Sequence, residues 1–112
     1  MSIDQRKELD VFFHMLYELD KGIRGLALLT TKDSNLEAIM EKLSESSYHS
    51  IIEKLNSNYI NVFFGEEEQI KVIQKMKKNS LKDLNPEEDF ILGVLLGYNT
   101  STQCKRYLEK TS

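Results

Sequence analysis

The pattern of hydrophobic and polar positions changes its period along the chain and predicts a mixture of helices and strands. Near the N-terminus, apolar residues recur at helical spacing: Phe12, Met15, Leu16 and Leu19. Gly22 suits the end of that helix, with Lys21 in its last turn. A strand over residues 11–17 is the alternative because this segment is rich in aromatic residues, but we favour the helix.

The next two elements are predicted to be a covered strand and a helix. Residues 25–31 form a short apolar run between Gly25 and a polar group at residues 32–34, which is typical of a strand covered on both faces. Asp33 or Ser34 can cap the helix that follows. Its apolar stripe consists of Leu36, Ile39, Met40 and Leu43, and residues 44–47 end it.

A β-hairpin is the clearest local signal. Residues 48–55 and 59–64 read as two strands, and the loop Asn56-Ser57-Asn58 between them carries asparagines that tolerate positive φ. Gly65 ends the second strand, and three glutamates at residues 66–68 open a helix. The inward side of that helix consists of Ile70, Ile73 and Met76.

The C-terminal part begins with a strongly marked helix start. Asn85 can cap, Pro86 suits the first helical position, and Glu88 can reach back to the cap in a capping box. Residues 90–98 are apolar on every face apart from Gly93 and Gly97, so we expect this helix to be the buried axis of the fold.

A closing helix follows the central one. Thr100 and Gln103 have the spacing of a second capping box. Cys104, Tyr107 and Leu108 share one face of this helix, and charged residues occupy the other.

These elements predict a single α+β domain over residues 1–112, in the order α-β-α-β-β-α-α-α with about five helices. The strands at residues 26–31 and 48–55 should be parallel and joined by a right-handed crossover. The strand at residues 59–64 should lie antiparallel between them, which gives a three-stranded mixed sheet. Because so small a sheet leaves exposed edges and an open face, we expect a homodimer.

Composition and charge exclude several classes of function. The chain of 112 residues is 40% hydrophobic and 29% charged, which is typical of a globular protein. Its net charge of −3 argues against nucleic-acid binding. The longest apolar run, residues 90–98, is too short to span a membrane, and residues 1–5 do not resemble a signal peptide. We therefore expect a cytoplasmic protein without nucleic-acid or membrane partners.

Cys104 is the only cysteine, so no internal disulfide can form. It is a candidate reactive thiol, because Lys105, Arg106 and the first turn of its helix favour the thiolate. The alternative is a small apolar residue on a buried face, and we favour that interpretation.

The residues do not assemble a recognisable catalytic or metal site. His14, Glu18 and His49 are the candidate ligands, but the sequence marks no further ligand beside them. Since no set of nucleophile, base and oxyanion donors stands out either, we expect no cofactor and no enzymatic activity.

Two further groups of residues are candidates for binding. Lys21 and Arg24 flank Gly22 and can bind an anion or a carboxylate, or they can simply be favourable cations at a helix end. Gly93 and Gly97 let another backbone approach closely, so with Phe90 they are candidates for packing in the dimer.

Three segments resemble a small bacterial family catalogued as domain of unknown function two-zero-two-three. They are Lys21-Gly22-Ile23-Arg24 leading into residues 26–31, residues 60–65, and residues 86–98 with Gln103-Cys104 and Arg106-Tyr107. The resemblance covers nearly the whole chain. It implies a three-stranded α+β fold, a homodimer and no assigned activity, and the proximity of such genes to flavodoxins implies a redox partner.

Our functional hypothesis is a small non-enzymatic accessory or binding module that acts on a flavodoxin-like protein. Basic clusters would steer an acidic partner of this kind. They consist of Lys75, Lys77, Lys78 and Lys82 around one helix end, and of Lys105, Arg106 and Lys110 along the closing helix. The alternative is a dimeric regulatory domain, similar to ferredoxin-like or ACT-like domains, that senses a small molecule.

Overall fold

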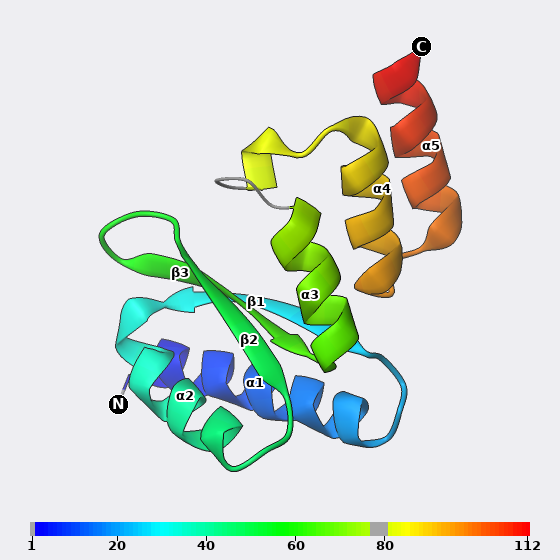
Figure 1. Ribbon diagram of the computed structural model, residues 1–112. Coiled ribbons are helices and arrows are strands. Elements are labelled where there is room, and N and C mark those ends of the chain that lie inside the picture. Colours follow the sequence, from blue (N-terminus) through cyan, green and yellow to red (C-terminus); the bar gives the residue numbers. More distant parts are fainter. Residues whose placement is uncertain (1, 77–80) are drawn as a thin grey trace.

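The computed structural model describes residues 2–76 and 81–112 and confirms the α+β class (Figure 1). The elements in chain order are α1 (Ile3–Asp20), β1 (Leu26–Lys32), the 3-10 turn η1 (Asp33–Asn35), α2 (Leu36–Ser44), β2 (His49–Lys54), β3 (Tyr59–Gly65), α3 (Glu67–Met76), the 3-10 turn η2 (Leu81–Asp83), α4 (Pro86–Leu95) and α5 (Thr100–Thr111).

The sheet has the strand order β1-β3-β2, with the last strand of the sequence in the centre, as predicted. Val62 of β3 pairs with Leu29 on one side and with Ile52 on the other. Both ladders are antiparallel. Because the two parallel strands never pair with each other, the sheet is antiparallel rather than mixed.

The β2–β3 hairpin is confirmed, but its turn has a different geometry from the expected one. Glycine alone adopts positive φ among the described residues, so the asparagines of the loop do not use it. Instead, the side-chain oxygen of Asn56 accepts hydrogen bonds from the backbone N–H of Asn58 at 2.8 Å and of Tyr59 at 2.9 Å. This Asx turn reverses the chain without a left-handed residue.

Alternate residues of the sheet enter two separate cores. Helices lie on both faces of the sheet (Figure 1). Helices α1 and α2 cover one face, where Phe12 packs against Phe64 with ring centroids 5.1 Å apart. Helices α3 and α4 cover the other face, where Ile70 and Leu92 join Phe63 in the second core. The covered strand that the sequence predicts at β1 is therefore confirmed.

Helix α1 is the helix predicted near the N-terminus, and the alternative of a strand there is wrong. Ser2 and Gln5 form a capping box at its start. Gly22, with φ +74, follows its end.

Two predicted helix starts differ in the structure. Neither Asp33 nor Ser34 caps α2, because both belong to the η1 turn and Asn35 occupies the cap position without a side-chain hydrogen bond. At α5 the cap is Asn99, whose side chain accepts from the N–H of Thr102 at 3.0 Å. This leaves the side chain of Gln103 free for another contact. The Asn85 capping box of α4 is confirmed.

Helix α4 is not the buried axis that its apolar sequence predicted. Leu92 and Gly93 are its buried residues, whereas Ile91 and Val94 are each 43% exposed. The helix packs on the second core with one side and on α5 with another, and its remaining side faces solvent. The radius of gyration, 14.5 Å, exceeds the roughly 13 Å of a compact chain of this length, which agrees with the protruding α4–α5 hairpin (Figure 1).

Candidate functional site

An ion-pair cluster joins the two helices of the α4–α5 hairpin. Asp89 accepts hydrogen bonds from Nε of Arg106 at 2.8 Å and from Nη2 of the same side chain at 3.2 Å. Nζ of Lys110 lies 3.3 Å from Oδ2 of Asp89. The hydrogen bonds from Arg106, opposed by partial burial, hold the pKa of the Asp89 carboxyl below its usual value.

A glycine on α4 and a glutamine on α5 pack closely against each other. Gly93 is buried, and a Cβ placed on it would collide with Oε1 and Cδ of Gln103. The Gln103 side chain fills this space and is only 9% exposed. Its amide has no hydrogen-bond partner among residues 2–76 and 81–112. The close approach expected at Gly93 therefore occurs inside one chain.

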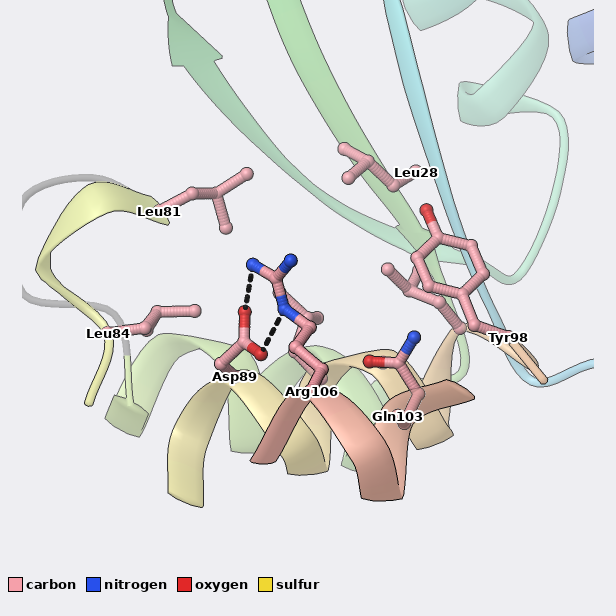
Figure 2. Close-up of a pocket in the computed structure, with 10 residues that line it drawn as sticks. Leu28, Leu81, Leu84, Asp89, Tyr98, Gln103 and Arg106 are labelled. Atoms are coloured by element: carbon pink, nitrogen blue, oxygen red, sulfur yellow. Dashed lines mark hydrogen bonds and ion pairs between the residues drawn. The ribbon is translucent and has the colours of Figure 1, made fainter. Parts of the chain in front are cut away.

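These residues form the floor of a cleft of about 370 Å³ between the sheet and the hairpin (Figure 2). It is lined by Leu28, Leu81, Leu84, Asp89, Leu92, Gly93, Leu96, Tyr98, Gln103 and Arg106. Figure 2 shows Asp89, Arg106 and Gln103 on the side opposite Leu28. The cleft thus combines apolar walls with a few polar groups, as small-molecule sites do.

A second hollow, which we call the outer groove, lies on the other side of the hairpin and has a volume of about 500 Å³. It is lined by Glu87, Phe90, Ile91, Cys104, Tyr107 and Leu108. The rings of Phe90 and Tyr107 lie 5.6 Å apart and join the helices along its floor. On α4, Asp89 and Gly93 line the cleft, whereas Ile91, two residues from each, lines the groove. Residues two apart point to nearly opposite sides of a helix, so the groove and the cleft face away from each other.

The groove changes the interpretation of Cys104. The residue shares a face with Tyr107 and Leu108, as predicted, but it is exposed. Our preferred interpretation of a buried apolar residue is therefore wrong, and the reactivity of the thiol stays a prediction.

Comparison with family models gives a match over residues 10–110 to the family described as Protein of unknown function (DUF2023). The chain belongs to this family. The match confirms the resemblance on which the sequence analysis relied. Comparison with curated proteins gives no match. Within the part that the structure describes, this DUF2023 member has no helix long and apolar enough to cross a membrane.

The DUF2023 chain uses its candidate anion-binding cations internally. Nη2 of Arg24 lies 3.4 Å from Oε1 of Glu18, so a carboxylate of the protein already faces this guanidinium. Nζ of Lys21 lies 5.6 Å from the centroid of the Tyr17 ring, at the end of α1. Both contacts fit the simpler interpretation of cations at a helix end.

The two histidines lie on different elements and face different carboxylates. Nε2 of His14 is 3.7 Å from Glu18, and Nε2 of His49 is 3.9 Å from Glu67. Across the described ranges, the structure brings no three of the residue types His, Cys, Asp and Glu together in a metal-binding arrangement.

The structure describes only some residues of the two basic clusters. Lys77 and Lys78 lie outside the described residues, as does the side chain of Lys82. Arg106 and Lys110 turn toward Asp89, which neutralises part of their charge. Lys105 remains exposed.

The sequence analysis did not predict that Gln103 lines the cleft, because it assigned this side chain to a helix cap. The signal that would have corrected it is Asn99, a stronger cap residue placed directly before Thr100.

Proposed function

We propose that this DUF2023 member is a cytoplasmic, non-enzymatic accessory module that acts as a homodimer, with two copies joined through the outer groove. The observation that supports the proposal is the exposed apolar side of the α4–α5 hairpin. The exposed free thiol in this groove suits a reducing compartment such as the cytoplasm.

The apolar residues around the groove are unusually exposed for their type. Ile91 and Val94 are each 43% exposed and Leu108 is 63% exposed. A helix that is apolar on every side is stable in water only when every side is covered. Helix α4 has cover from the sheet side and from α5, so its third side requires a further surface.

A second copy of the chain is the occupant that fits best. Among the described residues, Glu87 is the one carboxylate that lines the groove, and no Lys or Arg does so. A surface so poor in charge suits its own apolar counterpart in a two-fold dimer better than an acidic protein. A stable interface takes about 800 Å² from each partner.

The molar mass in solution tests the dimer. Sedimentation velocity at about 50 µM should give a mass of about 26 kDa, twice the 13.0 kDa of one chain, because an interface of the standard size class is stable at this concentration. Leu108→Glu places a charge in the groove and should give monomers. Ile23→Glu is the matched control, since Ile23 is 65% exposed but lies between α1 and β1. A monomeric wild-type protein would refute the proposal.

The rate of thiol labelling identifies the surface that the dimer buries. Cys104 lines the groove, so its reaction with a disulfide reagent should slow as the protein concentration passes the dissociation constant. The Leu108→Glu variant should react at one rate at all concentrations. A dimer whose Cys104 reacts independently of concentration would use another surface.

The proposed partner of the dimer is an acidic, flavodoxin-like protein, which the family resemblance suggests. Lys105 supports this choice because it is exposed and makes no ion pair within the described ranges. Exposed cations steer an acidic partner, and this raises the association rate.

Binding of a purified flavodoxin to the immobilised protein tests the partner. The association rate should fall as salt rises and should fall further in Lys105→Glu. Lys54→Glu is the matched control, because Lys54 is an exposed lysine at the far end of β2. Absence of binding at low salt, or equal effects of both substitutions, would exclude this partner while leaving the dimer unaffected.

A further inference from the structure

The cleft between the sheet and the α4–α5 hairpin holds a polar side chain that the protein does not satisfy. Gln103 is only 9% exposed, and no residue of the described chain forms a hydrogen bond with its amide. The amide nitrogen and oxygen are not among the fully buried atoms that lack a partner, so water in the cleft reaches them. Since the side chain points into the cleft, as Figure 2 shows, a ligand there can replace this water as the hydrogen-bond partner of the amide.

The backbone of α4 is adapted to this position of the amide. Any side chain at position 93 would occupy the space that the end of Gln103 fills, and glycine leaves it free. Glycine inside a helix is itself unfavourable by about 1 kcal/mol relative to alanine. The chain therefore places a destabilising residue where it allows Gln103 to lie within the cleft.

The charge beside Gln103 is positive. Asp89 carries one negative charge, while Arg106 and Lys110 carry two positive charges within 3.3 Å of it. Asp89 engages Nε and Nη2 of Arg106, so Nη1 keeps both of its N–H groups available. Arg106 lies three residues after Gln103, on the same side of α5.

The remaining walls are apolar. Leu28 of β1, Leu81 and Leu84 of the η2 segment, and Leu92 and Leu96 from α4 and its C-terminal cap surround the polar floor. The volume of about 370 Å³ is at the lower end of the range for small-molecule sites. The cleft therefore fits a ligand with a short hydrocarbon body and one anionic group.

We propose that this cleft binds a small monocarboxylate with an apolar body. The carboxylate accepts hydrogen bonds from Nη1 of Arg106 and from the Gln103 amide, and the hydrocarbon body lies against the leucines. The cleft lies within one chain, on the side of the hairpin opposite the outer groove, so binding does not depend on the dimer. This differs from a sensing domain that holds its ligand between two copies.

Hexanoate is a suitable probe, with 1-hexanol and hexylammonium as matched probes for the apolar body and the charge. Two-dimensional amide NMR at constant ionic strength should show saturable shifts with hexanoate at residues of α4, α5 and β1. Hexylammonium should give no such shifts, and 1-hexanol should bind at least about tenfold more weakly, because a hydrogen bond to a charged group is lost. Equal binding of hexanoate and 1-hexanol would overturn the carboxylate assignment.

Two substitutions test the two polar groups separately. Gln103→Leu keeps most of the volume and removes the amide, and Arg106→Gln removes the charge. Each should weaken hexanoate binding about tenfold or more. Lys105→Gln is the control, because it removes an exposed cation from the same helix outside the cleft and should leave the affinity unchanged. Unchanged affinity in folded Gln103→Leu and Arg106→Gln proteins would refute the site.

The monomeric Leu108→Glu variant separates this inference from the proposed dimer. It should bind hexanoate with the affinity of the wild-type protein, because Leu108 lines the outer groove and not the cleft. Loss of binding in this variant, if it remains folded, would place the ligand at the dimer interface and overturn the single-chain site.

Discussion

The side-chain amide of Gln103 lies in the space that a Cβ of residue 93 would occupy. One helix therefore accepts the side chain of the other because it has no side chain of its own at this turn. The contact couples the packing of the α4–α5 hairpin to the shape of the cleft, since Gly93 and Gln103 both line it.

Enlarging residue 93 should loosen the hairpin. Gly93→Leu should lower the free energy of unfolding by about 1–3 kcal/mol, because the added atoms overfill a close contact. Urea denaturation measures the change. Val94→Leu, at an exposed position of the same helix, is the control and should change stability by less than about 0.5 kcal/mol. Equal effects at both positions would contradict the packing described here.

The Asp89 ion pairs should stabilise the fold at neutral pH, and this stabilisation should be lost in acid. Hydrogen bonds from Arg106 lower the pKa of the Asp89 carboxyl from its usual 3.8, although partial burial opposes this. A lowered folded-state pKa gives stability that is complete above the unfolded-state pKa and is lost as pH falls through the folded-state value.

We therefore expect Asp89→Asn to be less stable than the wild-type protein at pH 7, by up to about 1 kcal/mol. The difference should shrink as pH falls below about 4, where the Asp89 carboxylate of the unfolded chain begins to be protonated while that of the folded chain stays charged. Urea denaturation at a series of pH values measures this. Asp10→Asn is the control, because Asp10 is exposed on α1, and a difference that stayed constant down to pH 2 would refute the role of Asp89.

Tyr48 should make the stability of the fold decrease as pH rises in alkaline solution. Burial and then its hydrogen bond to Asp20, at 2.7 Å, raise the pKa of the Tyr48 hydroxyl from 10.0 to about 12. A raised folded-state pKa gives stability that is complete below pH 10 and is lost as pH rises toward 12. Tyr48→Phe should lack this contribution, so its stability should approach that of the wild-type protein over the same interval.

The control for this experiment is Tyr17→Phe, which removes an exposed tyrosine and leaves the hydrogen bond to Asp20 intact. Denaturation midpoints between pH 9 and pH 12 are the measurement. Parallel curves for Tyr48→Phe and the wild-type protein would show that Tyr48 titrates normally.

Glu8 should contribute substantially to the free energy of unfolding, although it lies near the N-terminus. Its Oε2 accepts hydrogen bonds from Oγ1 of Thr31 at 2.5 Å and from Nδ2 of Asn35 at 2.8 Å, and both donors are buried. Glu8→Ala leaves them without this acceptor and should lower the free energy of unfolding by about 1–3 kcal/mol. Glu41→Ala, an exposed glutamate on α2, should have little effect, and thermal unfolding distinguishes the two.

The sheet could be predicted from the sequence because its signals are local. The apolar run at β1 and the asparagine turn between β2 and β3 indicate where the strands begin and end. A right-handed crossover from β1 to β2, followed by a hairpin, then places β3 in the centre. The caps predicted for α2 and α5 were wrong. Ser and Thr near a helix compete for the cap, and at α5 the neighbouring Asn99 takes it.

The burial of α4 and the cleft could not be predicted in this way. An apolar pattern on every face shows that a helix needs cover but does not identify what covers it, so the solvent-facing Ile91 and Val94 were missed. The pair Asp89–Arg106 joins residues 17 positions apart on two different helices, α4 and α5, and no periodicity of a single element reveals such a contact.

The central position of β3 has a consequence for the order in which the protein forms during synthesis. Strands β1 and β2 are made first but have no native pairing with each other, so both remain without a ladder until β3 enters between them. The first core is then complete, since its buried residues run from Leu9 to Phe64. The second core still lacks α3 and α4, so the hairpin that carries the cleft assembles last, on a sheet that is already in place.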